Sequence, residues 1–207
     1  MIITYHGVQS FKVQFGETIL AFDPISKDSK HATSNFGADI ALISVNHPDM
    51  NGIEQACRGD KQAFAIRGSG EYEVQGVFIK GVSSNSNYQE VERINTIYSV
   101  NLEGMNLCFL GALSNIQISA EAKQSLEDID ILFVPIGGYG TLSPSEAYKF
   151  AVSLEPSIII PMNYDEKSLK AFLKEGGDDN TESLDKFVIK KKDLEGKEGE
   201  IVVLAEQ

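Results

Sequence analysis

The chain divides into a first half of short strand patterns and a second half in which strand and helix patterns alternate. Runs of β-branched and aromatic residues, separated by glycine and polar residues, predict strands throughout the first half. They cover residues 2–7, 10–15, 18–23, 39–45, 63–66, 72–82, 95–102 and 106–113. The segment 39–45 is almost entirely apolar, which is typical of a strand that is buried on both faces.

In the second half, apolar residues recur with helical spacing between further strand patterns. Helices are predicted at 120–129, 142–156 and 165–177, and strands at 130–138, 157–164, 185–194 and 200–206. Ser143 is expected to cap the second helix, with Pro144 at its first position and Glu146 completing a capping box. A solvated polar loop is expected at 174–185. This order of elements predicts an α/β (α+β) protein in which two sheets face each other with helices outside.

The composition is that of a globular protein, and its charge disfavours some partners. The 207 residues are 42% hydrophobic and 23% charged, which predicts one domain over residues 1–207. The formal net charge of −12 argues against nucleic acid or an anionic membrane as a partner. Cys57 and Cys108 form no CxxC pair, and neither a secretory signal nor a membrane-spanning run is visible, so we expect a cytoplasmic protein.

The candidate chemistry lies in "ALISVNHPDMNG", residues 41–52, where an apolar strand pattern ends at His47 and Asp49. Imidazole and carboxylate are common metal ligands, and an oriented His–Asp pair can also act as a general base. In the structural alternative, Asp49 accepts backbone N–H groups of the turn and His47 donates to a neighbouring carbonyl or carboxylate. A triad with Ser44 would require a geometry that the sequence does not show.

A second candidate is the glycine-containing segment "VPIGGYGTL", which precedes the helix pattern at 142–156. Gly137, Gly138 and Gly140 suggest a phosphate loop, but the lysine and the spacing of that motif are missing. We therefore interpret these glycines as residues that let the chain turn tightly.

Six segments match, in order along the chain, characteristic segments of one enzyme family. They are residues 3–15, 18–24, 68–82, 95–113, 130–147 and 158–164. They include "GEYEVQGV" and "IIIPMNY". With them the chain resembles the metallo-β-lactamase superfamily, in the branch of small metal-dependent hydrolases similar to L-ascorbate-6-phosphate lactonase. The resemblance implies an αββα sandwich of two mixed β-sheets flanked by helices, and a site for two metal ions.

The family's main metal-binding motif is only half present. Where the family has "LTHxHxDHxG", this chain has "ISVNHPDMNG". His47 and Asp49 match the second histidine and the aspartate of that motif. Val45 stands in place of the first histidine and Met50 in place of the last.

The other ligand positions are altered as well. The metal-bridging aspartate of the family corresponds to Ala112, and the histidine three positions before it corresponds to Phe109. The last histidine corresponds to Asn163, and "SSNSNY" at 83–88 supplies no imidazole. The two remaining histidines, His6 and His31, are expected to be incidental surface or hairpin residues.

Too few donor atoms remain for a catalytic zinc site, which uses about three protein ligands and an open position for water. Val45 and Ala112 offer no donor, Met50 offers a soft thioether, and Asn163 offers one neutral oxygen. The sequence therefore predicts no resident metal or other cofactor.

The leading hypothesis is a pseudoenzyme, a binding or regulatory scaffold with a remnant pocket at His47, Asp49 and Asn163. Its partner is an unknown small molecule or protein, and a homo-oligomer is left open. The alternative is a hydrolase of a small ester, lactone or phosphorylated metabolite. It would use those same residues and one weakly bound zinc or manganese ion, held by His47 and Asp49.

Overall fold

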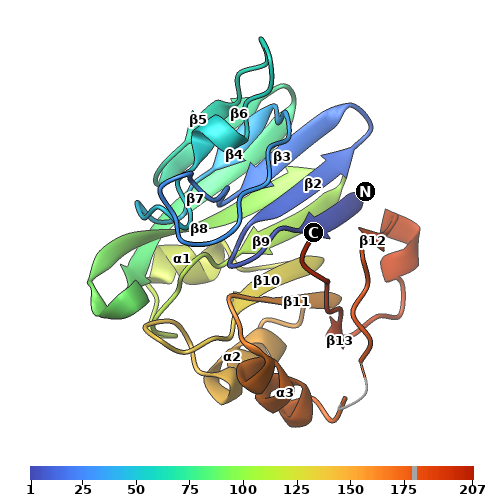
Figure 1. Ribbon diagram of the computed structural model, residues 1–207. Coiled ribbons are helices and arrows are strands. Elements are labelled where there is room, and N and C mark those ends of the chain that lie inside the picture. The colour runs from blue at the N-terminus through green and yellow to red at the C-terminus, as the bar shows by residue number, and fades with distance from the viewer. Residues whose placement is uncertain (179–180) are drawn as a thin grey trace.

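The computed structural model describes residues 1–178 and 181–207, in which two β-sheets pack face to face (Figure 1). The first sheet has six strands in the order β12-β1-β2-β3-β4-β5. Strands β12, β1, β2 and β3 are antiparallel, and β3, β4 and β5 are parallel. The bounds are Ile2–Tyr5 (β1), Phe11–Phe15 (β2), Thr18–Phe22 (β3), Ile40–Leu42 (β4), Phe64–Ile66 (β5) and Phe187–Val188 (β12).

The second sheet has seven strands in the order β13-β11-β10-β9-β8-β7-β6. Strands β6 to β9 are antiparallel, and β9, β10, β11 and β13 are parallel. The bounds are Gly70–Val74 (β6), Val77–Ser86 (β7), Arg93–Leu102 (β8), Met105–Phe109 (β9), Ile131–Pro135 (β10), Ile158–Met162 (β11) and Glu200–Ile201 (β13). Both sheets are mixed, so the predicted fold class is confirmed.

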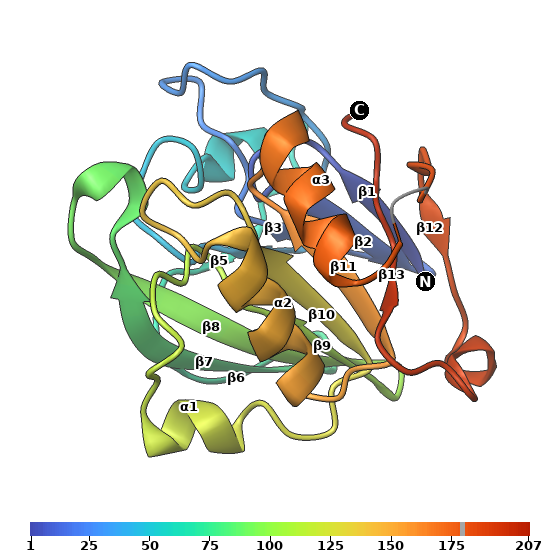
Figure 2. The same ribbon diagram turned by 90° about the horizontal axis from the view of Figure 1, so that it is seen from below.

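Three α-helices cover the outer face of the seven-stranded sheet (Figure 2). They are α1 (Ala120–Gln124), α2 (Pro144–Ser153) and α3 (Glu166–Glu175). Helix α2 begins with the predicted capping box of Ser143 and Glu146, and Asp165 caps α3. The six-stranded sheet has a thinner outer layer, a small alanine-rich cluster with the 3-10 helix Ile53–Gln55. None of the described helices is long and apolar enough to span a membrane.

The core between the sheets contains four phenylalanines, which are fully buried. The ring centroids of Phe22 and Phe109 are 5.0 Å apart, and those of Phe11 and Phe133 are 4.9 Å apart in an edge-to-face arrangement. Aromatic pairs of this kind add to the burial of apolar surface in stabilising a core. Phe109, which the resemblance places at the position of a histidine, is therefore a core residue.

Some predicted elements differ from those observed. The segment 72–82 is a hairpin rather than one strand, because Gln75 and Gly76 adopt φ of 53° and 77°, as a tight hairpin turn requires. The strand predicted at 185–194 is mostly wrong. It is confined to β12, and a 3-10 helix, Lys191–Leu194, follows, where the Asp193 carboxylate accepts the Lys190 N–H at 2.9 Å.

Other elements are shorter than predicted. Helix α1 covers only the first half of 120–129, and β13 only the start of 200–206. Of the loop predicted at 174–185, residues 179–180 lie outside the described residues.

The topology places several loops at one edge of the sandwich. The parallel pairing of β3 with β4, and of β9 with β10 and β11, puts the carboxyl ends of the strands within each sheet side by side. The loops that follow β4 and β9 meet across the two sheets, since Val45 and Ala112 belong to one buried cluster. This edge holds the candidate site.

Candidate functional site

Asp49 is the centre of a hydrogen-bond network at this edge, and its side chain is almost fully buried. Ser29 Oγ donates to Asp49 Oδ1 at 2.5 Å. The Tyr88 hydroxyl and Gln89 Nε2 donate to Asp49 Oδ2 at 3.0 and 3.1 Å. The backbone N–H donors expected for Asp49 are absent from the described residues, where side chains from two other loops supply the donors instead. The buried carboxylate is thus stabilised by neutral groups of the protein.

His47 lies beside Asp49 but does not donate to it through Nδ1. The backbone N–H of Asp49 donates to His47 Nδ1 at 3.2 Å, so the neutral ring carries its proton on Nε2. Nδ1 is 3.4 Å from Asp49 Oδ2. Burial lowers the pKa of His47 although the Asp49 carboxylate acts in the opposite direction. Burial therefore favours the neutral ring, and among the described residues Nδ1 accepts a hydrogen bond instead of donating the expected one.

His31, expected to be incidental, lies at the same place. Its Nε2 is 3.9 Å from Asp49 Oδ2, and half of its side chain is exposed. His6 is farther along the edge, where its ring stacks on Phe36 with centroids 5.1 Å apart. Burial lowers the pKa of His6 to about 4.

Three of the positions at which the sequence resemblance predicts lost metal ligands form an apolar cluster. Val45, Met50 and Ala112 are buried against Tyr88, with Val8 packed against them. The Tyr88 side chain also meets the His47 ring edge-to-face, with centroids 5.1 Å apart. Apolar side chains and one phenol therefore fill the space beside His47.

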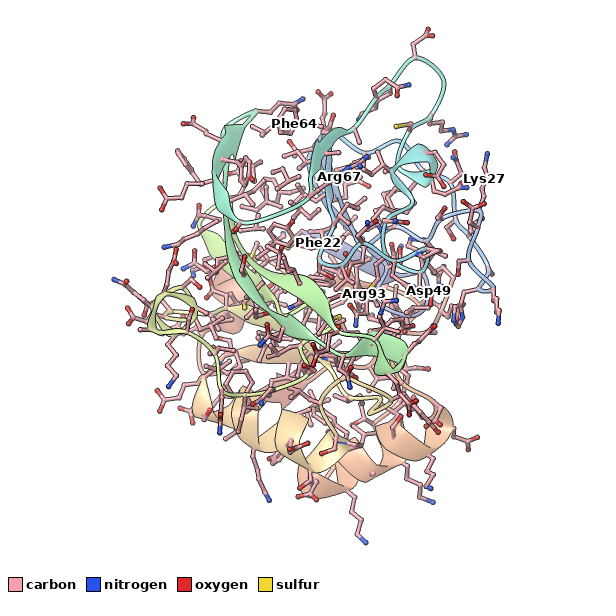
Figure 3. The ribbon with its side chains drawn as sticks, turned by 90° about the vertical axis from the view of Figure 1, so that its left-hand side faces the viewer. Phe22, Lys27, Asp49, Phe64, Arg67 and Arg93 are labelled. Atoms are coloured by element: carbon pink, nitrogen blue, oxygen red, sulfur yellow. The ribbon has the colours of Figure 1, made fainter. Side chains whose placement is uncertain are left out.

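Tyr88 is held in place by an unusual loop. It begins the 3-10 helix Tyr88–Glu90, in which Gln89 and Glu90 have φ of 54° and 61°. Left-handed residues of this kind cost about 1–2 kcal/mol each. Arg93 Nη1 donates to the Tyr88 carbonyl at 2.7 Å, which fixes the loop. Asp49 and Arg93 lie at the same edge of the molecule, whereas Phe22 lies deeper between the sheets (Figure 3).

The Tyr88 hydroxyl remains protonated. Burial raises its pKa well above the ordinary value, and the Asp49 carboxylate raises it further. The phenol is therefore a permanent donor to Asp49.

A second buried acid lies at the end of β3. Asp23 is fully buried, and it accepts the Ser44 N–H at 2.6 Å and the Ser44 hydroxyl at 2.5 Å. Burial raises the pKa of Asp23 to about 8, although both bonds from Ser44 act in the opposite direction. The Ser44 hydroxyl is engaged with Asp23 and makes no hydrogen bond to His47 among the described residues. The triad of Ser44, His47 and Asp49 is therefore not formed.

Asn163 makes its hydrogen bonds to loops other than the one that carries His47 and Asp49. Its backbone N–H donates to the Val8 carbonyl at 2.5 Å, and its Nδ2 donates to Thr141 Oγ1 at 3.3 Å. The described residues contain no hydrogen bond from Asn163 to His47 or Asp49. A Cβ atom at Gly137 would lie 2.0 Å from the Asn163 carbonyl oxygen, so this glycine allows close packing of the two loops.

The donor set does not fit a metal centre. Within residues 1–178 and 181–207, no group of three or more His, Cys, Asp and Glu side chains is arranged to hold a metal ion. Asp49 Oδ2 already accepts two hydrogen bonds, and His47 Nδ1 accepts one from the backbone N–H of Asp49. No chemical step through a metal follows from this geometry.

Sequence reasoning missed the residues that complete this network. Tyr88, Ser29 and Gln89 are residue types that occur everywhere on protein surfaces, and they belong to no motif. Only the tertiary fold shows that they meet Asp49. The available sequence signal was that "SSNSNY" at 83–88 contains no histidine where the resemblance implies one. This signal indicates a missing ligand and does not single out Tyr88 as a partner of Asp49.

Known proteins resemble this chain over most of its length. The model of the β-lactamase superfamily domain matches residues 2–163. A UPF0173 metal-dependent hydrolase of Thermococcus kodakarensis is 26% identical over an alignment of 187 residues, and the alignment covers 78% of this chain and 84% of that protein. A UPF0173 metal-dependent hydrolase from Listeria innocua is 23% identical over an alignment of 198 residues, and the alignment covers 79% of this chain and 85% of that protein.

Solved structures agree with this assignment. A protein of Thermotoga maritima, provisionally named a Zn-dependent hydrolase of the metallo-β-lactamase superfamily, is 28% identical with a TM-score of 0.79. The match covers 100% of this chain and 99% of that one. A metal-dependent hydrolase of Parabacteroides distasonis, also provisionally named, shares the fold at 19% identity, with a TM-score of 0.66 and 99% and 93% coverage. This chain belongs to the metallo-β-lactamase superfamily.

Proposed function

We propose that this chain is a pseudoenzyme of the superfamily, which binds a small molecule or a protein partner without zinc-dependent hydrolysis. The observation that carries the proposal is the buried cluster of Val45, Met50, Ala112 and Tyr88 at the former ligand positions. Hydrolysis by the family's chemistry needs a metal-bound water whose pKa is lowered to about 7. The cluster offers no imidazole or carboxylate to hold the metal.

The energetics of the site support the same conclusion. A metal ion at Asp49 would have to displace the donors from Tyr88 and Gln89 and find further ligands nearby. Exposing a buried aromatic side chain costs about 1.5–3 kcal/mol, and the lost hydrogen bond to a charged group costs a further 1.5–3 kcal/mol. Two ligands, His47 and Asp49, are too few to offset these costs.

A second candidate is a hydrolase with a reduced site for one zinc or manganese ion at His47 and Asp49. Two observations support it: the relatives are named metal-dependent hydrolases, and His31 lies close to Asp49. Such an enzyme would act on a small ester, lactone or phosphorylated metabolite. Asn163 would contribute only if the loop after β11 changed its hydrogen bonds.

Metal analysis separates the two candidates. The protein is purified without chelator or histidine tag, and its zinc and manganese content is measured by plasma mass spectrometry. The Listeria innocua relative, purified in parallel, is the positive control. We expect well under one metal ion per chain here. One tightly held zinc or manganese ion per chain, lost in a His47→Ala variant, would overturn the pseudoenzyme.

Neither nucleic acid nor a membrane is proposed as the partner. The net charge of −12 opposes binding to both kinds of polyanionic surface.

A further inference from the structure

A cavity of about 240 Å³ borders the apolar cluster, since Tyr88 and Val8 line it together with His31 and Asn163 of the candidate site. Its wall is rich in aromatic rings, which come from β1, from the loop after β10 and from the loop after β11. The residues that matter for its chemistry are Tyr5, Tyr88, Tyr139, Tyr164, Asp165 and Glu206. The volume is smaller than that of a drug-sized pocket, so it suits a small ligand.

The charged groups on the wall are acidic. Asp165 and Glu206 contribute carboxylates, and the described residues that line the cavity include no lysine or arginine. Asp165 is engaged as the cap of α3, where it accepts the Ser168 N–H at 2.7 Å and the Ser168 hydroxyl at 2.8 Å. Glu206 forms no ion pair within the described chain. Of the two carboxylates, only that of Glu206 makes no side-chain hydrogen bond among the described residues, so we take it as the one that meets a ligand.

The position of Glu206 is fixed by the backbone. Tyr5 and Glu206 form a parallel bridge, and Gln207 N–H donates to the Tyr5 carbonyl at 3.0 Å. The Glu206 carboxylate lies over Gly7, where a Cβ atom would be 2.7 Å from Oε1. Its negative potential reaches the tyrosines: burial, followed by the Glu206 carboxylate, raises the pKa of Tyr164 to about 12.

Tyr139 stands at the mouth of this cavity in a strained and exposed position. Its side chain is 80% exposed, and its backbone has φ of 46°. The Gln89 N–H donates to the Tyr139 carbonyl at 3.2 Å, which ties this residue to the loop that holds Tyr88. An exposed aromatic ring on a strained backbone does not stabilise the hydrophobic core. Backbone strain of this kind is concentrated at ligand sites.

We propose that this cavity binds a small organic cation, an ammonium group held between the tyrosine rings and the Glu206 carboxylate. Aromatic faces attract cations, and quaternary ammonium groups are typically recognised by aromatic cages with a nearby negative charge. The net charge of −12 raises the local concentration of cations around the molecule. A bare metal ion fits less well, because one free carboxylate and phenol rings are a poor ligand set for a hard cation.

This inference deepens the proposed function and rests on it, because the cavity serves as a binding site rather than as the entrance to a metal centre. Choline is the probe, and its neutral isostere 3,3-dimethyl-1-butanol is the matched ligand. Both are titrated in EDTA by calorimetry and by NMR line shifts. We expect choline to bind at least about tenfold more tightly than the alcohol. Equal binding of the two, or no choline binding, overturns the inference.

Variants test the two parts of the site. Glu206→Gln should weaken choline binding at least about fivefold, whereas Glu103→Gln, an equal change of charge in the exposed turn between β8 and β9, should leave it unchanged. Tyr139→Ala should weaken it by about 2- to 30-fold and Tyr139→Phe should preserve it, because the ring and not the hydroxyl attracts the cation. Thermal melts establish that each variant is folded.

The outcomes separate this inference from the proposed function. Equal effects of Glu206→Gln and Glu103→Gln, or full binding by Tyr139→Ala, overturn the cation site. A protein that carries one metal ion per chain as purified and still prefers choline in EDTA overturns the pseudoenzyme alone. A metal-free protein that does not distinguish choline from the alcohol overturns the cation site alone.

Discussion

The buried carboxyl group of Asp23 should make the stability of this protein depend on pH. Its pKa is about 8 in the folded chain and 3.8 for an ordinary aspartate, so the folded state binds the proton more tightly. Unfolded chains release this proton above pH 4, and the folded chain retains it up to about pH 8. The free energy of unfolding therefore decreases as pH rises between these values, by about 1.4 kcal/mol per pH unit.

Asp23→Asn isolates this effect. The amide cannot ionise, and its oxygen can still accept a hydrogen bond from Ser44, which donates both its N–H and its hydroxyl to Asp23 in the natural chain. Urea denaturation of both proteins is measured from pH 5 to pH 8. We expect the variant to gain about 2.7 kcal/mol relative to the natural chain between pH 5 and pH 7. Because histidine contributions are common to both proteins, they cancel in the difference.

A constant difference in unfolding free energy across this range would refute the reasoning. It would mean that Asp23 is ionised in the folded protein and that its two bonds from Ser44 outweigh the cost of burial. A difference of the opposite sign, with the natural chain gaining stability as pH rises, would refute it as well.

Three further changes test the site and its supports. Tyr88→Phe removes one hydrogen-bond donor from the buried Asp49 carboxylate and should cost about 1.5–3 kcal/mol of unfolding free energy, measured by urea denaturation. Tyr148→Phe is the control and should cost under about 0.5 kcal/mol, because the Tyr148 hydroxyl makes no hydrogen bond among the described residues. Gly140→Ala should cost about 3 kcal/mol or more of unfolding free energy, because φ is 89° and a Cβ would lie 1.9 Å from a backbone oxygen. Gly138→Ala should cost about 1 kcal/mol, because φ is 67° but the space around a Cβ is open. Equal losses of stability in thermal melts of the two variants would contradict this. Burial lowers the pKa of His6 to about 4, so the folded state resists protonation of the ring, and the free energy of unfolding falls as pH decreases from about 6.5 to about 4. His6→Gln should flatten this part of the plot of unfolding free energy against pH. An unchanged slope would show that the ring is solvated.

The sequence predicted the elements that depend on local patterns. The capping box of Ser143 and Glu146 and the buried strand β4 follow from residue types at fixed spacing. It failed at 185–194, where the apolar pattern was too short to specify a strand and a capped 3-10 turn formed instead. Local competition between side chain and backbone hydrogen bonds decides such cases.

For the candidate site, the sequence alone determined which donor atoms are missing, because an alanine or a valine has none in any conformation. It also supplied the family resemblance, since the order of six segments is a property of the chain. Which side chains surround His47 and Asp49 was decided only by the tertiary structure. Tyr88 and Asp49 are separated by 39 positions in the chain, and their hydrogen bond exists because two sheets bring the loops together. The same holds for Glu206 above Gly7: no local pattern encodes a contact between chain segments that only the packed fold places side by side.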